Sequence, residues 1–177
     1  VPDSNKMTIE THHLELIPCD ADILSAAIKG NEMLAEKINC AVEENWTEFG
    51  IEALQYALDR LSESEEQQKW WTYFPIHKKD KMLIGSCGYK GKPTADGKVE
   101  IGYEVAPKYR NQGLATEITK GLIENAFKHQ RVHSIMAHTL AEDNPSTKVL
   151  QKCGFEKVDE INDPDDGLIW KWELKRK

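Results

Sequence analysis

The sequence lacks any long apolar run, since no segment approaches the roughly 18 to 20 residues that a membrane-spanning helix requires. Charged residues make up 30% of the 177 residues. No signal-peptide pattern is recognisable, so we expect a cytoplasmic protein with no membrane partner. The length suits one domain better than two, which predicts a single domain over residues 1–177 with a frayed start at residues 1–8.

Cysteine is also scarce. The four cysteines lie within apolar patterns and are not spaced as CxxC pairs: Cys19, Cys40, Cys87 and Cys153. This arrangement favours reduced thiols over disulfides. The histidines are not joined by cysteines or carboxylates into a ligand set, so no metal is predicted.

Positive charge is in deficit. The chain has 23 lysines and arginines against 30 aspartates and glutamates, a formal net charge of −7. An acidic surface repels the phosphate backbone of nucleic acids, so no nucleic-acid partner is expected. The same charge mildly favours a cationic ligand such as an amine.

The spacing of apolar residues and the turn signals predict the secondary structure. In chain order, we expect a strand at 11–18, helices between 20 and 61, strands at 70–77, 82–89 and 99–105, a helix at 113–128, a strand at 131–140, a helix at 144–154, and strands at 155–161 and 168–174. This order predicts an α+β fold in which helices pack on a mainly antiparallel sheet.

The segment from Val99 to Ala115 carries the clearest chemical signal. The strand VEIGYEV turns into RNQGLA, which begins a long helix. The first N–H groups of a helix have no intrahelical partner and lie at the positive end of its dipole, so they suit a phosphate or pyrophosphate. Gly113 would let that backbone approach closely, and Arg110 could add a positive charge. On these residues alone the segment also suits an ordinary helix start.

Two other phosphate-binding loops are absent: the chain has neither GxxxxGK[ST] nor GxGxxG. Instead, EIGYEV followed by RNQGLA resembles the acetyl-CoA motif of the GNAT acetyltransferases. Further along, AHTLAEDNPSTKVLQKCGF at 137–155 is similar to the second cofactor-contacting strand and helix of the ribosomal-protein N-terminal acetyltransferase (RimJ/RimL-like) branch.

The resemblance implies the GNAT fold, a mixed and mainly antiparallel sheet that is splayed at the cofactor site, with helices on both faces. The cofactor would be acetyl-CoA, the acyl donor, with no metal. Its pantetheine arm would lie between the strands ending at Val105 and near Leu140. The implied cofactor contacts are the backbone of Glu104 and Val105, the amides of Arg110, Asn111, Gln112, Gly113, Leu114 and Ala115, and the side chains of Asn144 and Ser146.

The chemistry requires further groups. An attacking amine must be neutral, so a base helps. We expect Glu104 to be that base, directly or through water, with Glu100 as the runner-up. The Val105 amide would stabilise the oxyanion. Ser146 is the candidate acid for the departing thiolate, because Leu150 stands where many family members have a tyrosine.

Other roles remain possible for residues of this second motif and for the tryptophans near the acceptor region. Ser146 and Asn144 could simply satisfy the helix start, with Asn144 as an N-cap. Asp143 stands where the resemblance leads one to expect asparagine, and we expect it to point to solvent. Tryptophans at positions 46, 70 and 71 are more typical of the core, although they lie where an acceptor site would form.

The predicted function is therefore transfer of acetyl from acetyl-CoA to a primary amine by direct attack in a ternary complex. The resemblance favours a peptide or protein N-terminal amine as acceptor. A small amine, such as a polyamine, an antibiotic or an amino-acid derivative, is the alternative, and so is a catalytically silent acyl-CoA-binding module. A homodimer is a further expectation from the resemblance.

Overall fold

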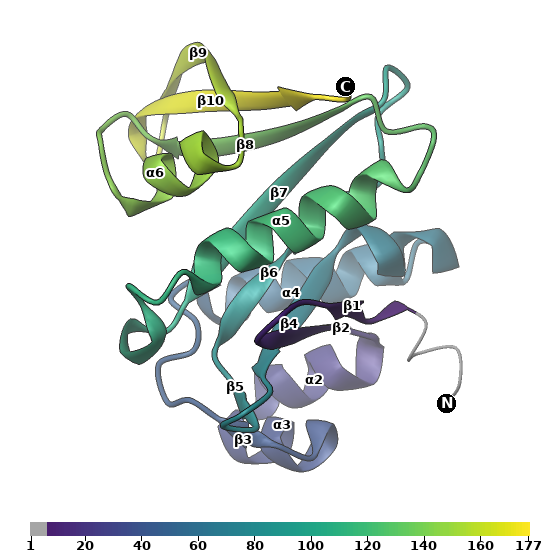
Figure 1. Cartoon of the computed structure of the whole chain (residues 1–177). Coiled ribbons are helices and arrows are strands. Elements are labelled where there is room, and N and C mark those ends of the chain that lie inside the picture. Colours follow the sequence, from purple (N-terminus) through teal and green to yellow (C-terminus); the bar gives the residue numbers. More distant parts are fainter. Residues whose placement is uncertain (1–6) are drawn as a thin grey trace.

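The computed structural model describes residues 7–177, in which a long curved sheet carries helices on both faces (Figure 1). Most of the predicted frayed start, residues 1–6, lies outside the described residues. The strands are β1 Ile9–Glu10, β2 Leu14–Pro18, β3 Ala41–Val42, β4 Thr72–His77, β5 Met82–Leu83, β6 Gly85–Tyr89, β7 Lys98–Val105, β8 Ser134–Leu140, β9 Glu156–Asp163 and β10 Gly167–Lys175. The helices are α2 Ala21–Lys29, α3 Asn31–Ile38, α4 Gly50–Leu61, α5 Leu114–Phe127 and α6 Pro145–Lys152, with 3-10 turns η1 Glu65–Trp70 and η2 Pro107–Tyr109.

The strand order is β1-β2-β4-β6-β7-β8-β10-β9, with the short β3 and β5 beside β4. Along this path every neighbouring pair is antiparallel except β7 and β8, which are parallel. The predicted mixed, mainly antiparallel sheet is therefore confirmed.

Helix α5 covers one face of the sheet. Its residues Leu114, Ile118, Leu122 and Ala126 recur every fourth position and are all buried. They pack in a core with side chains of β2, β7, β8 and α6. This spacing made the predicted helix at 113–128 accurate to one residue at each end.

The opposite face is covered by α2, α3 and α4, which appear behind the strands in Figure 1. Leu24, Leu34 and Leu54 from these helices pack against Phe74 and Trp46 in a second core. Trp46 and Phe74 meet edge to face, with ring centroids 5.1 Å apart. The expectation that tryptophans serve the core is confirmed for Trp46 and for Trp70, each 2% exposed.

Four predicted strands differ clearly from the structure. Those at 70–77 and 131–140 begin only at Thr72 and Ser134, because Trp70 ends the 3-10 turn η1 and residues 131–133 form a turn and loop. The strand at 11–18 starts only at Leu14, because the Thr11 hydroxyl accepts a hydrogen bond from the Leu14 amide (3.1 Å) and closes a turn after β1. The strand at 82–89 is divided at Ile84. There the Ile84 amide donates to Pro75 O (3.1 Å) of β4, while its carbonyl accepts from Ala106 N (2.7 Å), so the chain changes partners at this residue.

Candidate active site

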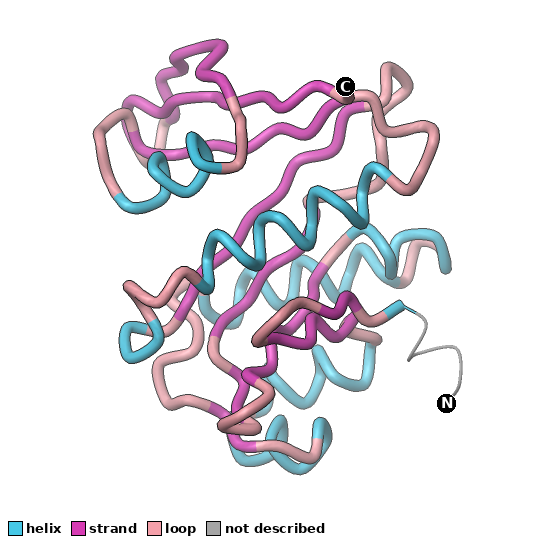
Figure 2. Tube along the Cα trace, viewed as in Figure 1, coloured by secondary structure: helices cyan, strands magenta, loops and turns pink. Residues whose placement is uncertain are grey.

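The sheet opens between β7 and β8. Their parallel pairing covers only three residue pairs, from Lys98↔Ser134 to Glu100↔Met136. Beyond these pairs β7 continues beside β6, and β8 continues beside β10. Figure 2 shows the two strands diverging from this short contact. The predicted splay between them is confirmed.

The direction of backbone groups along β7 decides which amides face this opening. The Ala106 amide donates to Ile84 O (2.7 Å), on the β6 side of the strand. Backbone groups of consecutive strand residues point to opposite edges. The Val105 amide therefore points into the opening, whereas the backbone of Glu104 faces β6. Of the two backbone contacts expected with a pantetheine arm, only that of Val105 has the right direction.

A tight turn joins η2 to α5. Asn111 and Gly113 both have left-handed backbone, with φ of 62° and 77°. Gly113 is the N-cap of α5, and a Cβ at Gly113 would meet no heavy atom within 4 Å. The backbone is therefore open to a ligand at the point where the free amides of a 14-residue helix gather, which suits an anion.

A cavity of about 360 Å³ lies over this turn. A second cavity, of about 370 Å³, contains Glu104, Asn144 and Ser146 and shares five residues with the first: Val105, Arg110, Ala115, Pro145 and Val149. The two cavities thus form one groove, which we call the β7–α6 groove. It runs from the helix start at Gly113 to the Glu104 carboxylate.

Glu104 is held by the loop that precedes α4. Its Oε2 accepts from Thr47 Oγ1 (2.9 Å), and its Oε1 accepts from the Glu48 amide (2.6 Å). Partial burial raises the pKa of the Glu104 carboxyl, and these two hydrogen bonds oppose part of that rise. A half-buried carboxylate with a raised pKa is suited to accept a proton from an amine.

The runner-up, Glu100, lies further along β7 and is in contact with a lysine and a histidine side chain. Its Oε2 is 2.8 Å from Lys90 Nζ and its Oε1 is 3.2 Å from His138 Nδ1. It does not line the β7–α6 groove. These contacts make Glu100 a poorer candidate for the base than Glu104.

Arg110 lines both cavities, but its guanidinium is already engaged. Nε donates to Val105 O (2.9 Å), and Nη2 is 3.1 Å from Glu48 Oε1. The guanidinium that we expected to bind a phosphate thus binds the end of β7 and the loop that holds Glu104. The structure assigns the Arg110 side chain to bracing these two segments.

The second motif forms the start of α6, and this helix start lines the groove. Asn144 Oδ1 accepts from the Thr147 amide, and Thr147 Oγ1 accepts from the Asn144 amide, both at 3.0 Å. Asn144 is thus the N-cap of α6 in a reciprocal capping box. Ser146 lines the groove half-buried, and its carbonyl accepts from Tyr103 Oη (3.3 Å). Asp143 is exposed, as expected, but its Oδ1 also accepts from Thr147 Oγ1 (3.3 Å) and so turns toward the start of α6.

Comparison with known proteins agrees with this geometry. The family model of the acetyltransferase (GNAT) domain matches residues 16–156. This chain belongs to the GNAT acetyltransferase family. It is accordingly an N-acetyltransferase, in a family that uses acetyl-CoA as acyl donor.

The individual relatives within this family have low sequence identity to the chain. It is 26% identical to an uncharacterised N-acetyltransferase, YjdG, of Bacillus subtilis over 148 residues, 83% of this chain and 88% of the relative. Among solved structures, RimL, a ribosomal-protein α-N-acetyltransferase in complex with coenzyme A, is similar with a TM-score of 0.70 at 11% identity, covering 95% of this chain and 97% of that one. A chimera of the Vibrio cholerae spermidine N-acetyltransferase SpeG with hSSAT has a TM-score of 0.67 at 15% identity, covering 93% and 96%.

Some groove residues of this GNAT chain were not anticipated from the sequence. Lys148 and Lys152 of α6 line the cavity over the Gly113 turn, together with Thr116 of α5. Their spacing of four residues puts both ammonium groups on one face of the helix, which is a signal that the sequence did contain. Thr47 and Glu48, which hold Glu104, carried no such signal.

Residues 7–177 contain neither a membrane-spanning helix nor a cluster of metal-ligating side chains. None of the helices in this range is long and apolar enough to cross a membrane. Within the same range, no group of three or more His, Cys, Asp or Glu side chains is placed to hold a metal ion.

Proposed function

We propose that this GNAT enzyme transfers the acetyl group of acetyl-CoA to the N-terminal amine of a peptide or protein, by direct attack in a ternary complex. The observation that carries the proposal is the β7–α6 groove. One end of the groove offers free helix amides to a pyrophosphate, and the other end brings the Val105 amide and the Glu104 carboxylate together. The similarity of 137–155 to the RimJ/RimL-like branch, and the structural likeness to RimL, support an N-terminal acceptor.

The groove residues would divide the binding of acetyl-CoA between them. The amides from Asn111 to Ala115 would hold the pyrophosphate, with Lys148 and Lys152 adding positive charge from α6. The Arg110 amide, which the sequence also suggested, already donates to Pro107 O (3.3 Å). The Val105 amide would bond to the pantetheine arm where the ladder between β7 and β8 has ended. Asn144 and Ser146 would flank the thioester from the start of α6.

Proton transfer sets the roles of the remaining groups. An α-amino group has a pKa near 8, so Glu104 would take the proton as nitrogen attacks the carbonyl carbon. The Val105 amide would stabilise the negative charge that develops on the oxygen. As the new N–C bond forms, the C–S bond breaks, and the departing thiolate would be protonated by Ser146 or water. Acetylated amine and coenzyme A are the products.

Direct attack is favoured over an acyl-cysteine route. Burial raises the pKa of the Cys87 thiol well above its ordinary range and also raises that of Cys153. Both thiols therefore stay protonated near neutral pH, where only the thiolate is a good nucleophile. Neither sulfur has a histidine partner among the hydrogen bonds and ion pairs of the described residues.

A small amine is the second candidate acceptor, because the spermidine acetyltransferase chimera superposes almost as well as RimL. Thiol release from acetyl-CoA, measured against N-terminal peptides, polyamines and aminoglycosides, tests both. Turnover with peptides supports the proposal, and turnover confined to small amines replaces it with the second candidate. Calorimetric binding of acetyl-CoA without turnover on any amine would indicate a catalytically silent binding module.

A further inference from the structure

A third cavity, of about 410 Å³, lies between α4 and strands β6 and β7. It shares Phe49 and Tyr103 with the β7–α6 groove, so the two spaces meet beside Glu104. We call it the α4 pocket. Its volume is in the range typical of small-ligand sites, and nothing in the proposed handling of acetyl-CoA uses it.

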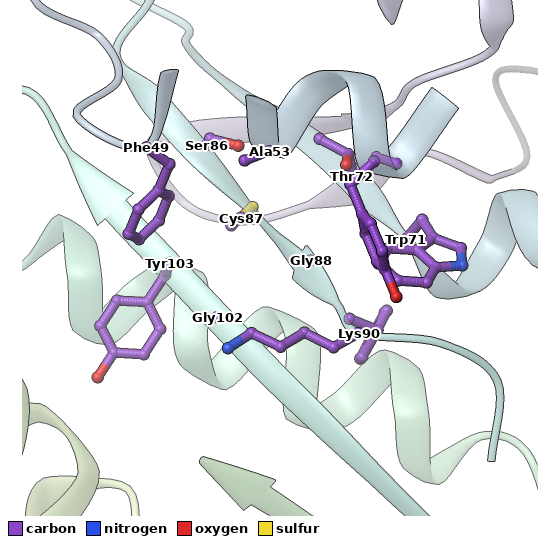
Figure 3. A pocket seen from close by; sticks show the side chains of 13 residues that line it. Phe49, Ala53, Trp71, Thr72, Ser86, Cys87, Gly88, Lys90, Gly102 and Tyr103 are labelled. Carbon is purple, nitrogen blue, oxygen red and sulfur yellow. The ribbon is translucent and has the colours of Figure 1, made fainter. Parts of the chain in front are cut away.

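The walls of the α4 pocket are aromatic or small. Phe49 and Tyr103 stand at one end and Trp71 at the other, with Ala53 of α4 and Gly102 of β7 between them (Figure 3). The Trp71 indole nitrogen donates to Gln67 Oε1 (2.8 Å), so its polar atom is already satisfied and its ring remains for the cavity. Small residues at 53 and 102 leave room for a guest that the aromatic rings would contact.

Several of these apolar groups are exposed to water in the absence of a guest. Phe49 is 63% exposed and Tyr56 is 56% exposed, values that are high for large hydrophobic residues. Tyr56 packs edge to face on Trp71, with ring centroids 5.6 Å apart. Burying such surface under an apolar ligand is favourable at about 25 cal/mol per Å².

Charge in the α4 pocket discriminates against polycationic acceptors. Among the residues that line it, Lys90 is the only charged one, and its Nζ is 2.8 Å from Glu100 Oε2. Figure 3 shows the Lys90 side chain extending along the pocket toward Gly102. A second ammonium group on the acceptor would find no carboxylate among the lining residues, because Glu100, which lies outside the lining, is already paired with Lys90.

We propose that the α4 pocket is the acceptor subsite and takes an uncharged, bulky apolar or aromatic group carried beside the reacting amine. The amine itself would lie at Glu104, where the pocket and the groove meet. This inference rests on the proposed function, because it assigns a substrate class to that site. The apolar group could belong to the first residues of a peptide or to an arylalkylamine, which share this chemistry.

Matched acceptors test the inference. Peptides that begin with phenylalanine or lysine form one arm, and phenethylamine and spermidine form the other. Burying one large apolar group changes specificity by about 10- to 100-fold, so kcat/KM should favour the aromatic member of at least one pair by that factor. Preference for the aromatic member in one arm alone identifies the source. Equal or better turnover of the cationic members in both arms overturns the inference.

Filling the pocket supplies an independent test. Ala53 is exposed on α4 and lines the pocket, so Ala53→Trp should raise the KM for the aromatic acceptor at least 10-fold without changing the Kd of acetyl-CoA. The matched control is Gln55→Trp, an exposed position on the same helix outside the pocket, which should leave both constants unchanged. An unaltered KM in Ala53→Trp, or an equal rise in Gln55→Trp, contradicts the proposal.

Binding without catalysis separates this inference from the proposed function. Calorimetric titration of the protein saturated with coenzyme A, with both the peptide pair and the pair of phenethylamine and spermidine, should show the aromatic member of at least one pair binding at least 10-fold more tightly than its cationic partner, even if no acetyl transfer occurs. Loss of transfer with that preference intact refutes only the transferase proposal. Transfer to amines with no preference in the titration refutes only the assignment of the α4 pocket.

Discussion

Glu104 takes its proposed role from its surroundings on β7 and in the loop before α4. Partial burial raises its pKa, while Thr47 Oγ1 and the Glu48 amide fix both carboxylate oxygens. A carboxyl group is protonated below its pKa and then cannot accept the proton of the amine. Transferase activity should therefore fall as the pH falls through the raised pKa of Glu104.

Glu104→Gln removes this titrating group. We expect kcat to fall by about 10²- to 10⁴-fold, as for loss of a general base, with an unchanged Kd for acetyl-CoA. The acid limb set by the Glu104 carboxyl should disappear, leaving only the fall in rate that protonation of the acceptor amine causes near its own pKa. Glu100→Gln is the matched substitution on the same strand and should keep the limb. If Glu100→Gln loses the limb and Glu104→Gln retains it, Glu100 is the base.

The sequence could suggest Glu104 but not what holds it. A carboxylate at the end of a strand before RNQGLA is visible from the motif. Thr47 and Glu48 lie 56 or more residues away, in a segment with no recognisable pattern. The same is true of Arg110, whose side chain suits a phosphate in isolation but lies beside Glu48 in the fold. Such long-range partners depend on tertiary packing, which local spacing does not encode.

At the scale of elements, α6 faces α5 across the groove. Lys148 and Lys152 are one helical turn apart, and both line the cavity over the Gly113 turn. Replacing each by alanine should weaken binding of acetyl-CoA by about two- to five-fold, because exposed charge pairs contribute little individually. The loss should shrink at high salt. Acceptor KM should not change.

Lys29→Ala is the control for this prediction. Lys29 is an exposed lysine at the end of α2, on the opposite face of the sheet. Its removal should leave the affinity for acetyl-CoA unchanged. Equal affinity in the Lys148 and Lys152 variants and the parent protein would show that α6 supplies no charge to the cofactor.

Helices and strands were predicted correctly where one periodic pattern or one capping residue determines their bounds. The four-residue repeat from Leu114 to Ala126 defined α5, and the Asn144-Pro145 start defined α6. The predictions failed where hydrogen bonds between distant segments interrupt a pattern that continues in the sequence. The division of the 82–89 strand at Ile84, which bonds to Pro75 and Ala106, is one such case.

For the whole molecule, the α+β arrangement and the splayed sheet followed from element order and from the resemblance to the GNAT family. The α4 pocket did not, because its walls come from the start of α4, from β6 and from β7, which are distant in sequence. The proposed cofactor end of the site is thus encoded by a short motif, whereas the proposed acceptor end forms only in the assembled fold. This division explains why the donor was predictable and the acceptor was not.

The central claim is that acetyl-CoA binds where β7 turns into α5. Gly113→Val tests it, because the new side chain would enter the open space over the turn and would also occupy a left-handed conformation at φ 77°. Gly167→Val is the matched control. Gly167 has φ 75° and equally open surroundings, but it lies at the β9–β10 turn, away from the groove. The backbone cost, about 1 to 2 kcal/mol, should be shared by both variants.

The deciding measurement is calorimetric titration of acetyl-CoA into the parent protein and these two variants, with Tm recorded for each. Both variants should stay folded with Tm lowered by about 2 to 8 °C. The account predicts tight binding by the parent protein and by Gly167→Val, and a loss of at least 100-fold in Gly113→Val. Equal affinity in all three proteins, or no binding by the parent, would contradict it.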